Sequence, residues 1–208
     1  MNMENKMGKQ TLYPLLIAGI MGMSGLIGAT SASAASNCVV SANVKQNANT
    51  VTGTAGDDTI DCTSASSAKT INGLGGNDTM TGTIFADKIN GGDGNDTSTG
   101  LGGDDSIIAG EGNNTSTGSA GNDTLTSLAG SDTLTGSEGN DTLTAGVGAD
   151  ILDGSNGVDT LNGGAGDDKL TGPAADGSVD TLNGDAGIDT CTIELPDGDK
   201  RNSCELIG

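Results

Sequence analysis

The stretch from Gly118 to Thr144 reads GSAGNDTLT, SLAGSDTLT, GSEGNDTLT, a nine-residue unit written three times with small changes. Position four of each unit is Gly, position six is Asp and position eight is Leu. A helix with 3.6 residues per turn and a coiled-coil heptad both lack a nine-residue period, so the long-helix interpretations fail. The repeat therefore predicts another kind of regularly coiled structure.

Each unit reads as a turn followed by a short strand. Positions one to six are rich in Gly, Asp and Asn, which form tight turns and tolerate positive φ. Positions seven to nine read Thr-Leu-Thr, an alternation that points Leu inward and both Thr outward. One unit cannot bury its single Leu, whereas many units coiled into a solenoid stack Leu on Leu. We therefore predict an all-β fold, a parallel β-roll or β-solenoid of about sixteen half-turns.

The same register extends in both directions and is nearly unbroken from Gly73 to Thr171. Less regular units flank it, at Val44–Thr52, Gly53–Asp61, Cys62–Asn72, Gly172–Asn183 and Gly184–Thr192. Position six carries Asp in most units, namely Asp58, Asp78, Asp87, Asp96, Asp105, Asp123, Asp132, Asp141, Asp150, Asp159, Asp168, Asp180 and Asp189. Asn114 takes this place in one unit, and Lys69 takes it in the expanded unit Cys62–Asn72.

The units resemble the RTX calcium-binding nonapeptide, G-G-x-G-x-D-x-U-x, in which U is a large apolar residue. The closest matches are Gly91–Asp96 and Gly163–Asp168, which read GGDGND and GGAGDD. Most other units keep Gly at position four and Asp at position six, and carry Ser, Leu or Thr at position two. The resemblance implies multiple Ca2+ ions between successive turns, held by the position-six Asp residues and by turn carbonyls.

The electrostatics of the repeat favour the same cation. In a roll of two sheets, alternate units place their turns on one edge, so each edge carries a column of carboxylates about 4.8 Å apart. Neighbouring charges at that spacing repel by about 1 kcal/mol in water and by more where water is reduced. Ca2+ accepts about 6 to 8 oxygens in a flexible shell, whereas Mg2+ dehydrates reluctantly. We expect calcium at the position-six Asp residues and a weaker site at uncharged Asn114; the alternative is that these Asp residues only form turns.

The energy of one unit predicts that calcium binding and folding are coupled. A buried Leu contributes about 1.5–3 kcal/mol, whereas fixing nine backbone residues costs on the order of 9–18 kcal/mol. Each ladder hydrogen bond adds only about 0.5–1.5 kcal/mol. We therefore expect a disordered chain without the metal and a β-roll with it.

Composition limits the classes of function. The chain has 208 residues and a formal net charge of −20, with 37 Gly, one Tyr, one Phe and no Trp or His. This inventory cannot build a compact globular core and favours a thin architecture. The acidic surface repels nucleic acid and anionic lipid, so neither is expected as a partner. Because His is absent and no H-E-x-x-H, G-x-S-x-G or P-loop motif occurs, we expect a non-enzymatic protein.

Residues 1–34 read as a secretory signal peptide. Lys6 and Lys9 precede an apolar run from Leu12 to Ile27, and Ala32–Ala34 forms a small-residue cleavage site. The alternative is a retained membrane anchor, but Gly and Ser interrupt the run, which is shorter than the ~20 residues needed to span. Cleavage would change the formal charge from −20 to −21, because Glu4 and both Lys residues leave. We expect a secreted, extracellular protein without membrane contact after cleavage; attachment to the cell surface stays open.

Export explains the cysteines, which lie near the two ends of the mature chain. Four Cys allow three pairings, and the local bridges Cys38–Cys62 and Cys191–Cys204 are favoured because the others would join opposite ends of the solenoid. The alternative, reduced or metal-binding thiols, has no CxxC spacing to support it. The predicted organisation is a cap with a first degenerate half-turn at 35–52, the calcium-binding roll at 53–192, and a C-terminal cap at 193–208.

The outward threonines suggest further partners. Four Thr-x-Thr pairs should fall on consecutive rungs of one sheet, at Thr79/Thr81, Thr97/Thr99, Thr115/Thr117 and Thr133/Thr135. Ser98 and Ser116 should face inward between them, and the array should end at Ile151 and Asp153. The array resembles the flat faces of β-solenoid ice-binding proteins, which implies ice as an alternative partner. Thr is also simply a good solvent-facing strand residue, and a matrix or adhesion module stays open.

Overall fold

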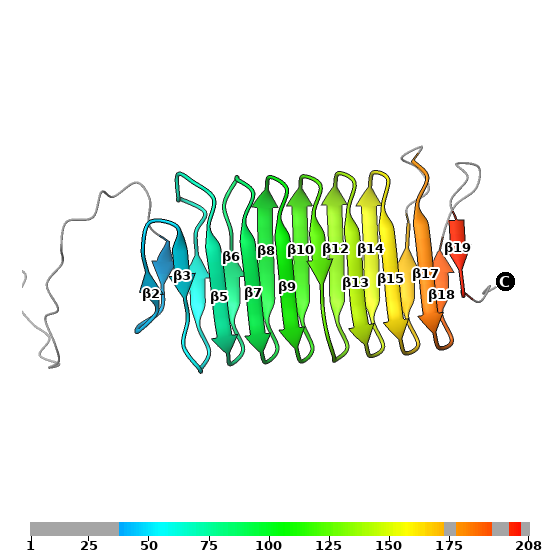
Figure 1. Cartoon of the computed structure of the whole chain (residues 1–208), viewed down its shortest axis with the longest axis horizontal. Coiled ribbons are helices and arrows are strands. Elements are labelled where there is room, and N and C mark those ends of the chain that lie inside the picture. The colour runs from blue at the N-terminus through cyan, green and yellow to red at the C-terminus, as the bar shows by residue number, and fades with distance from the viewer. Residues whose placement is uncertain (1–37, 173–177, 193–199, 205–208) are drawn as a thin grey trace, which may run out of the picture. The chain divides into compact units, whose positions relative to one another are not determined.

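The computed structural model describes residues 38–172, 178–192 and 200–204. The predicted signal peptide and most of the predicted C-terminal cap lie outside the described residues. The chain divides into two units, 1–32 and 33–208, and all described residues belong to the second. Every regular element in this part is a β-strand, and successive strands from β3 onward alternate between two sheets (Figure 1). The predicted all-β parallel solenoid is thereby confirmed.

The two sheets, here sheet A and sheet B, contain nine and ten strands. In order across sheet A the strands are β1 (Val39–Val40), β4 (Thr59–Asp61), β6 (Thr79–Thr81), β8 (Thr97–Gly102), β10 (Thr115–Ala120), β12 (Thr133–Glu138), β14 (Ile151–Asn156), β16 (Lys169–Thr171) and β18 (Thr190–Thr192). In order across sheet B they are β2 (Lys45–Gln46), β3 (Thr50–Thr52), β5 (Thr70–Gly75), β7 (Lys88–Asp93), β9 (Ser106–Glu111), β11 (Thr124–Thr126), β13 (Thr142–Val147), β15 (Thr160–Ala165), β17 (Thr181–Ala186) and β19 (Lys200–Asn202).

One inward side chain from the middle of each short strand segment builds the core. In sheet B, Leu125 lies in register with Ile107 on one side and Leu143 on the other, and all three are buried. The alternation of one inward and two outward side chains is what the Thr-Leu-Thr pattern predicts. In sheet A the inward residues include Ser98 and Ser116, which are buried as expected and whose hydroxyls have no hydrogen-bond partner among the described residues.

Many strands are longer than positions seven to nine alone. Between β10 and β12, pairing covers Thr115 to Thr117, skips Gly118, and resumes where Ser119 lies opposite Ser137. The first residues of the next unit therefore still pair with the neighbouring coil, and the strand is longer than an isolated three-residue segment.

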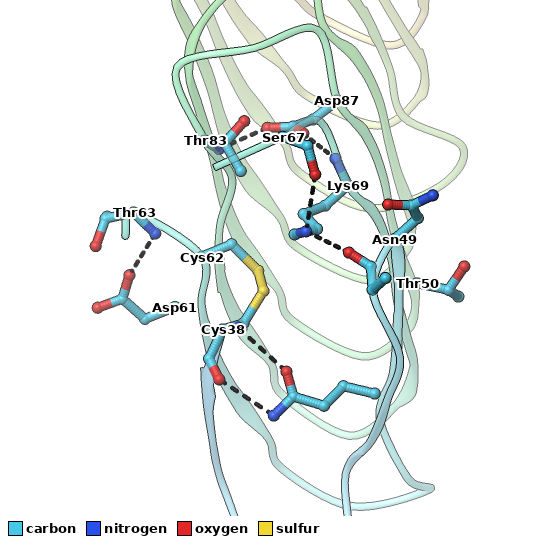
Figure 2. Close-up of a disulfide and its surroundings, with 12 residues drawn as sticks. Cys38, Asn49, Thr50, Asp61, Cys62, Thr63, Ser67, Lys69, Thr83 and Asp87 are labelled. Atoms are coloured by element: carbon cyan, nitrogen blue, oxygen red, sulfur yellow. Dashed lines mark hydrogen bonds between the residues drawn. A yellow bond between two sulfur atoms is a disulfide. The ribbon is translucent and has the colours of Figure 1, made fainter. Parts of the chain in front are cut away.

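The N-terminal end of the roll differs from the rest. Strand β1 pairs antiparallel with β4, and β2 pairs antiparallel with β3, whereas all other strand pairs among the described residues are parallel. The disulfide Cys38–Cys62, with a Cα–Cα distance of 4.1 Å, links the residue before β1 to the residue after β4 (Figure 2). The second disulfide, Cys191–Cys204, has a Cα–Cα distance of 5.6 Å and links β18 to the segment after β19. The favoured pairing is confirmed.

The turns are joined by a ladder at position five. The backbone N–H of Asn95 donates to Oδ1 of Asn77 at 2.8 Å, and the N–H of Asn113 donates to Oδ1 of Asn95 at 2.7 Å. On the other edge, the N–H of Asn140 donates to Oδ1 of Asn122 at 2.9 Å. These side chains are exposed, and in other turns the carboxylate of Asp57, Asp104 or Asp167 is the acceptor instead of a neutral amide.

Candidate metal centre

The position-six residues form two columns, one along each edge of the roll. The residues that precede the strands of sheet A, here column A, are Asp58, Asp78, Asp96, Asn114, Asp132, Asp150, Asp168 and Asp189. The position-six residues that precede strands β5 to β17 of sheet B, here column B, are Lys69, Asp87, Asp105, Asp123, Asp141, Asp159 and Asp180. All of them are buried, so every sequence-predicted site residue lies in one of two internal columns.

A hydrogen-bond ladder links each column along the roll. The backbone N–H of Asp78 donates to Oδ1 of Asp96 at 2.8 Å, and that of Asp132 donates to Oδ1 of Asp150 at 2.7 Å. In column B the N–H of Asp105 donates to Oδ1 of Asp123 at 2.7 Å. The carboxylate thus satisfies a buried amide in the turn before it. In each of these pairs, the acceptor residue uses one of its two carboxylate oxygens, Oδ1, for this hydrogen bond.

The second carboxylate oxygen is the unusual feature of the columns. In most turns beyond the N-terminal end, Oδ2 is buried and has no hydrogen-bond partner in the described part of the chain. This holds for Asp78, Asp96, Asp105, Asp123, Asp132, Asp141, Asp150, Asp168 and Asp189. A buried polar atom without a partner costs on the order of 1–3 kcal/mol, and more when it is charged. A cation at each such oxygen would remove that cost.

The second oxygen lies inside its own turn, against the backbone of position one. A Cβ built on Gly100 would lie 2.1 Å from Oδ2 of Asp105, and one built on Gly118 would lie 2.2 Å from Oδ2 of Asp123. Because no side chain fits between them, the turn keeps the oxygen close to main-chain atoms. In these two turns glycine at position one leaves room for the carboxylate, whereas Ser127 and Ala145 take this position in the turns of Asp132 and Asp150.

Burial changes the protonation of these groups. Burial, together with the nearby charges of Asp123 and Asp87, raises the pKa of Asp105 from its ordinary value of 3.8 to about 7. Burial likewise raises the pKa of Asp141 and of Asp150 to about 6. In each case the backbone hydrogen bond to the carboxylate opposes the rise. Without a cation, these carboxylates therefore hold a proton far more readily than exposed ones.

The shape of the turns is set at positions two and four. In most turns both positions have positive φ, as at Gly92 (110°) and Gly94 (131°). Ser119 adopts the same conformation at position two, with φ 91°, as does Leu101, with φ 84°. Ser or Leu in place of the family's Gly thus preserves the turn, although a non-glycine residue with positive φ is uncommon. Leu128 is an exception and is not among the positive-φ residues.

Two turns with Thr at position two are built differently. Thr54 and Thr83 are not among the positive-φ residues, in keeping with the steric cost of that conformation for a β-branched side chain. The N–H of Thr54 donates to Oδ2 of Asp58 at 2.6 Å, and the N–H of Thr83 donates to Oδ2 of Asp87 (Figure 2). These two carboxylates therefore receive a protein donor where the others have none.

The N-terminal ends of both columns are closed by protein groups. Oδ1 of Asp58 accepts from the Ser41 hydroxyl at 2.8 Å; burial alone would raise the pKa of Asp58, but the hydrogen bonds lower it overall. In column B, Lys69 is 3% exposed, and its ammonium donates to the carbonyl of Ala48 and to the Ser67 hydroxyl at 3.3 Å (Figure 2). A cationic side chain thus stands at the end of a column of carboxylates.

The remaining ligands of a metal ion would be backbone carbonyl oxygens and water. Nowhere among the described residues do three or more Asp, Glu, Cys or His side chains gather into one group. A hard cation that takes several oxygens can draw the others from backbone carbonyls and water. Side-chain identity alone could not reveal such ligands, because every residue carries a carbonyl. No helix in the described ranges is long and apolar enough to cross a membrane.

Comparison with known proteins agrees with this geometry. A family model described as the RTX calcium-binding nonapeptide repeat (4 copies) matches residues 46–61, 72–107, 90–125, 108–143, 126–161, 144–172 and 153–191. These segments contain every position-six Asp of both columns. No curated protein matches the chain.

Proposed function

Because the chain belongs to the RTX calcium-binding nonapeptide repeat family, we propose that it is a secreted, non-enzymatic calcium-binding β-roll protein whose folding is coupled to Ca2+ binding in its Gly/Asp turns. The observation that carries this proposal is the row of buried carboxylate oxygens without hydrogen-bond partners. Calcium supplies positive charge and a flexible oxygen shell at such places.

The proposed ligands are the position-six carboxylates of the two columns, together with carbonyls of the same Gly-rich turns. The orphaned oxygens at Asp105, Asp123 and Asp141 support consecutive sites along column B. Asp58 and Asp87 differ, because both oxygens of each accept hydrogen bonds from protein groups. We therefore propose that the ions begin beyond these two N-terminal residues.

Calcium binding is coupled to folding because the buried carboxylate oxygens destabilise the folded chain when no ion is bound. Each orphaned oxygen is unsatisfied only in the folded chain, because water solvates it in the unfolded chain. An ion that binds the folded state alone stabilises it by RT ln(1 + [L]/Kd), about 2.7 kcal/mol per site at 100 times Kd. Several sites acting together supply enough free energy to decide whether the roll forms.

Circular dichroism and calorimetry on the mature chain test the proposal. We expect β-structure with calcium, loss of that signal on chelation, and recovery when calcium is added back. Isothermal titration gives the number of ions taken up during folding, and a parallel titration with Mg2+ serves as the control. An equal β-signal with and without calcium would refute the coupling, and the absence of calcium uptake would refute the function.

Secretion rests on residues 1–34 and on the two disulfides, which persist in oxidising compartments. Expression of the full chain in a bacterial host, followed by N-terminal sequencing of the exported protein, tests it. We expect export and a mature chain that begins at Ala35. Retention of the whole chain inside the cell would contradict this part of the proposal.

Ice binding is a second candidate function, favoured by the register of sheet A. Thr97 lies opposite Thr79 and Thr115, and Thr99 lies opposite Thr81 and Thr117. The array continues to Thr133 and Thr135 and ends at Ile151 and Asp153, as the sequence predicts. Its rungs repeat at about 4.8 Å, so the hydroxyls form a regular outward lattice.

Ice shaping and thermal hysteresis in the presence of calcium test this candidate. We expect that Thr97→Tyr together with Thr115→Tyr abolishes both. Thr124→Tyr together with Thr142→Tyr places the same change on the outward face of sheet B, where it should have no effect. Unmodified ice growth with the folded wild-type protein would reject ice binding and leave the calcium proposal untouched.

A further inference from the structure

Asn114 is the single position-six residue of column A that is not a carboxylate. It is 2% exposed and keeps its place in the ladder. Its Oδ1 accepts from the backbone N–H of Asp96 at 2.8 Å, and its own N–H donates to Oδ1 of Asp132 at 2.7 Å. The amide therefore performs the structural task that each neighbouring carboxylate performs.

The other half of the amide has a different partner. Because the Asp96 N–H requires an acceptor, the amide oxygen must face it, and the NH2 group must face the interior of the turn. There Nδ2 donates to the carbonyl of Gly112 at 3.1 Å and to the carbonyl of Gly110 at 3.3 Å. Two carbonyl oxygens of the turn thus converge on the atom that replaces Oδ2.

The same carbonyls exist in turns that carry Asp. Gly110 and Gly112 occupy positions two and four and have φ values of 102° and 105°. In the turn of Asp123, φ is also positive at both positions, 91° at Ser119 and 140° at Gly121. We infer that the equivalent carbonyls there lie near the buried Oδ2 of Asp123, which as a carboxylate oxygen can accept but cannot donate. An Asp turn thus gathers oxygens that need a cation, whereas the Asn114 turn contains its own donor.

We propose that the Asn114 amide takes the place of a calcium ion, so that the turn Ala109–Asn114 folds without metal and divides the calcium sites of column A into two groups. This inference rests on the proposed function, since it concerns which turns of the roll take up calcium. One group includes Asp78 and Asp96, and the other begins at Asp132. Column B has no such interruption from Asp105 to Asp141.

Reciprocal substitutions test the proposal by counting ions. Asn114→Asp replaces the internal donor with a carboxylate oxygen, and we expect one more bound Ca2+ per chain than in wild type. Asp123→Asn makes the opposite change in a turn of the same shape, and we expect one fewer. Calcium is measured at saturation by isothermal titration and by metal analysis after equilibrium dialysis, with circular dichroism to establish that each variant is folded.

The outcomes separate this inference from the proposed function. If the wild type binds calcium but Asn114→Asp binds no additional ion, the proposal for Asn114 is wrong and calcium binding stands. If the wild type binds no calcium, the proposed function fails and the inference fails with it. A gain at Asn114→Asp together with a loss at Asp123→Asn supports both.

A measurement on the wild type covers the case in which a variant does not fold. In the calcium-saturated protein, the side-chain NH2 protons of Asn114 should exchange with solvent far more slowly than those of exposed Asn95, because two carbonyls hold them. Side-chain amide spectra after transfer to D2O record this difference. Exchange at Asn114 as fast as at Asn95 would overturn the proposal.

Discussion

The N-terminal turns of the roll and its central turns place a carboxylate at the same position and satisfy it in different ways. Asp58 and Asp87 receive protein donors at both oxygens, and Lys69 closes column B with its ammonium. In the central turns, the carboxylates of Asp105 and Asp141 each accept one backbone N–H, from Asp87 and Asp123, and their second oxygen is buried without a hydrogen-bond partner among the described residues.

This difference indicates which turns of the roll can depend on a bound ion for their stability. An ion between two turns needs a turn on each side, and the first turn of a column has a neighbour on one side only. At the N-terminal end, hydroxyl, amide and ammonium groups are the donors. We infer that the N-terminal end, which also carries the Cys38–Cys62 bridge and the antiparallel strands β1 and β2, is the part of the roll that depends least on calcium.

The largest expected effect is the response of the metal-free chain to pH. The pKa values of about 7 at Asp105 and about 6 at Asp78, Asp141 and Asp150 lie above the ordinary value of 3.8. The folded state therefore binds these protons more tightly, so stability is fully present below about pH 4 and is lost as pH rises through 6 and 7. Asp58, with its lowered pKa, responds in the opposite direction.

We accordingly expect more β-structure at pH 5 than at pH 8 in the metal-free protein, measured by circular dichroism after removal of divalent ions. General loss of negative charge would act the same way, so Asp105→Asn together with Asp141→Asn is the control. That variant should be less sensitive to pH than the wild type. A metal-free chain with more structure at pH 8 than at pH 5 would contradict the assignment of these pKa shifts.

Two alanine substitutions compare the regions directly. Asp58→Ala should destabilise the roll by about 1.5–3 kcal/mol for each of two lost hydrogen bonds, without changing the number of bound calcium ions. Asp141→Ala should lose one ion and its linked stabilisation, about 2.7 kcal/mol at 100 times Kd. Urea unfolding in calcium, combined with titration calorimetry, measures both. Loss of an ion at Asp58→Ala would show that the N-terminal turns are not independent of calcium.

A smaller effect is expected at the closed end of column B. Lys69→Met keeps the length of the side chain and removes the donor to the Ala48 carbonyl, which should cost about 1–3 kcal/mol. Lys88→Met, an outward-facing substitution on β7, is the control and should change stability by less than about 0.5 kcal/mol. Equal effects of the two substitutions in urea unfolding would remove the special role of Lys69.

The smallest expected effect lies in the core of sheet A. The buried hydroxyl of Ser116 has no hydrogen-bond partner, so Ser116→Ala should stabilise the folded roll by about 1 kcal/mol. Thr115→Ala, on the outward side of the same strand, should have a change within about 0.5 kcal/mol. Thermal unfolding in saturating calcium measures the difference. Destabilisation at Ser116→Ala would mean that the hydroxyl contributes to the fold.

Periodicity was sufficient to predict much of this molecule. The nine-residue spacing predicts the parallel solenoid, the inward Leu stack and the Thr register of sheet A, because each depends only on position within the unit. The positions of Cys38 and Cys191 near opposite ends predict the disulfide pairing, because the other pairings would join the two ends of the solenoid. The repeat predicts the place of Asp123 and its neighbours before each strand, whereas their burial is a finding of the structure.

Other features depend on backbone conformation, which residue type does not fix. Ser119 and Leu101 adopt positive φ at position two, whereas Leu128 and the two threonines Thr54 and Thr83 do not, and the two threonine turns supply a backbone donor to the second oxygen of their carboxylates. The direction of the Asp ladder and the inward turn of the Asn114 amide arise from contacts across a coil. The nine-residue pattern treats all position-six Asp residues alike, so it could not predict which carboxylates receive protein donors at both oxygens.

The ladder of position six also has a consequence for how the chain is made. The N–H of Asp123 bonds to a carboxylate 18 residues further on, so that amide finds its acceptor only after the following coil has been synthesised. In a chain that is made from its N-terminus, the last complete coil therefore still lacks the acceptor for this backbone N–H. In whatever order the chain folds, each coil is therefore completed by the coil that follows it.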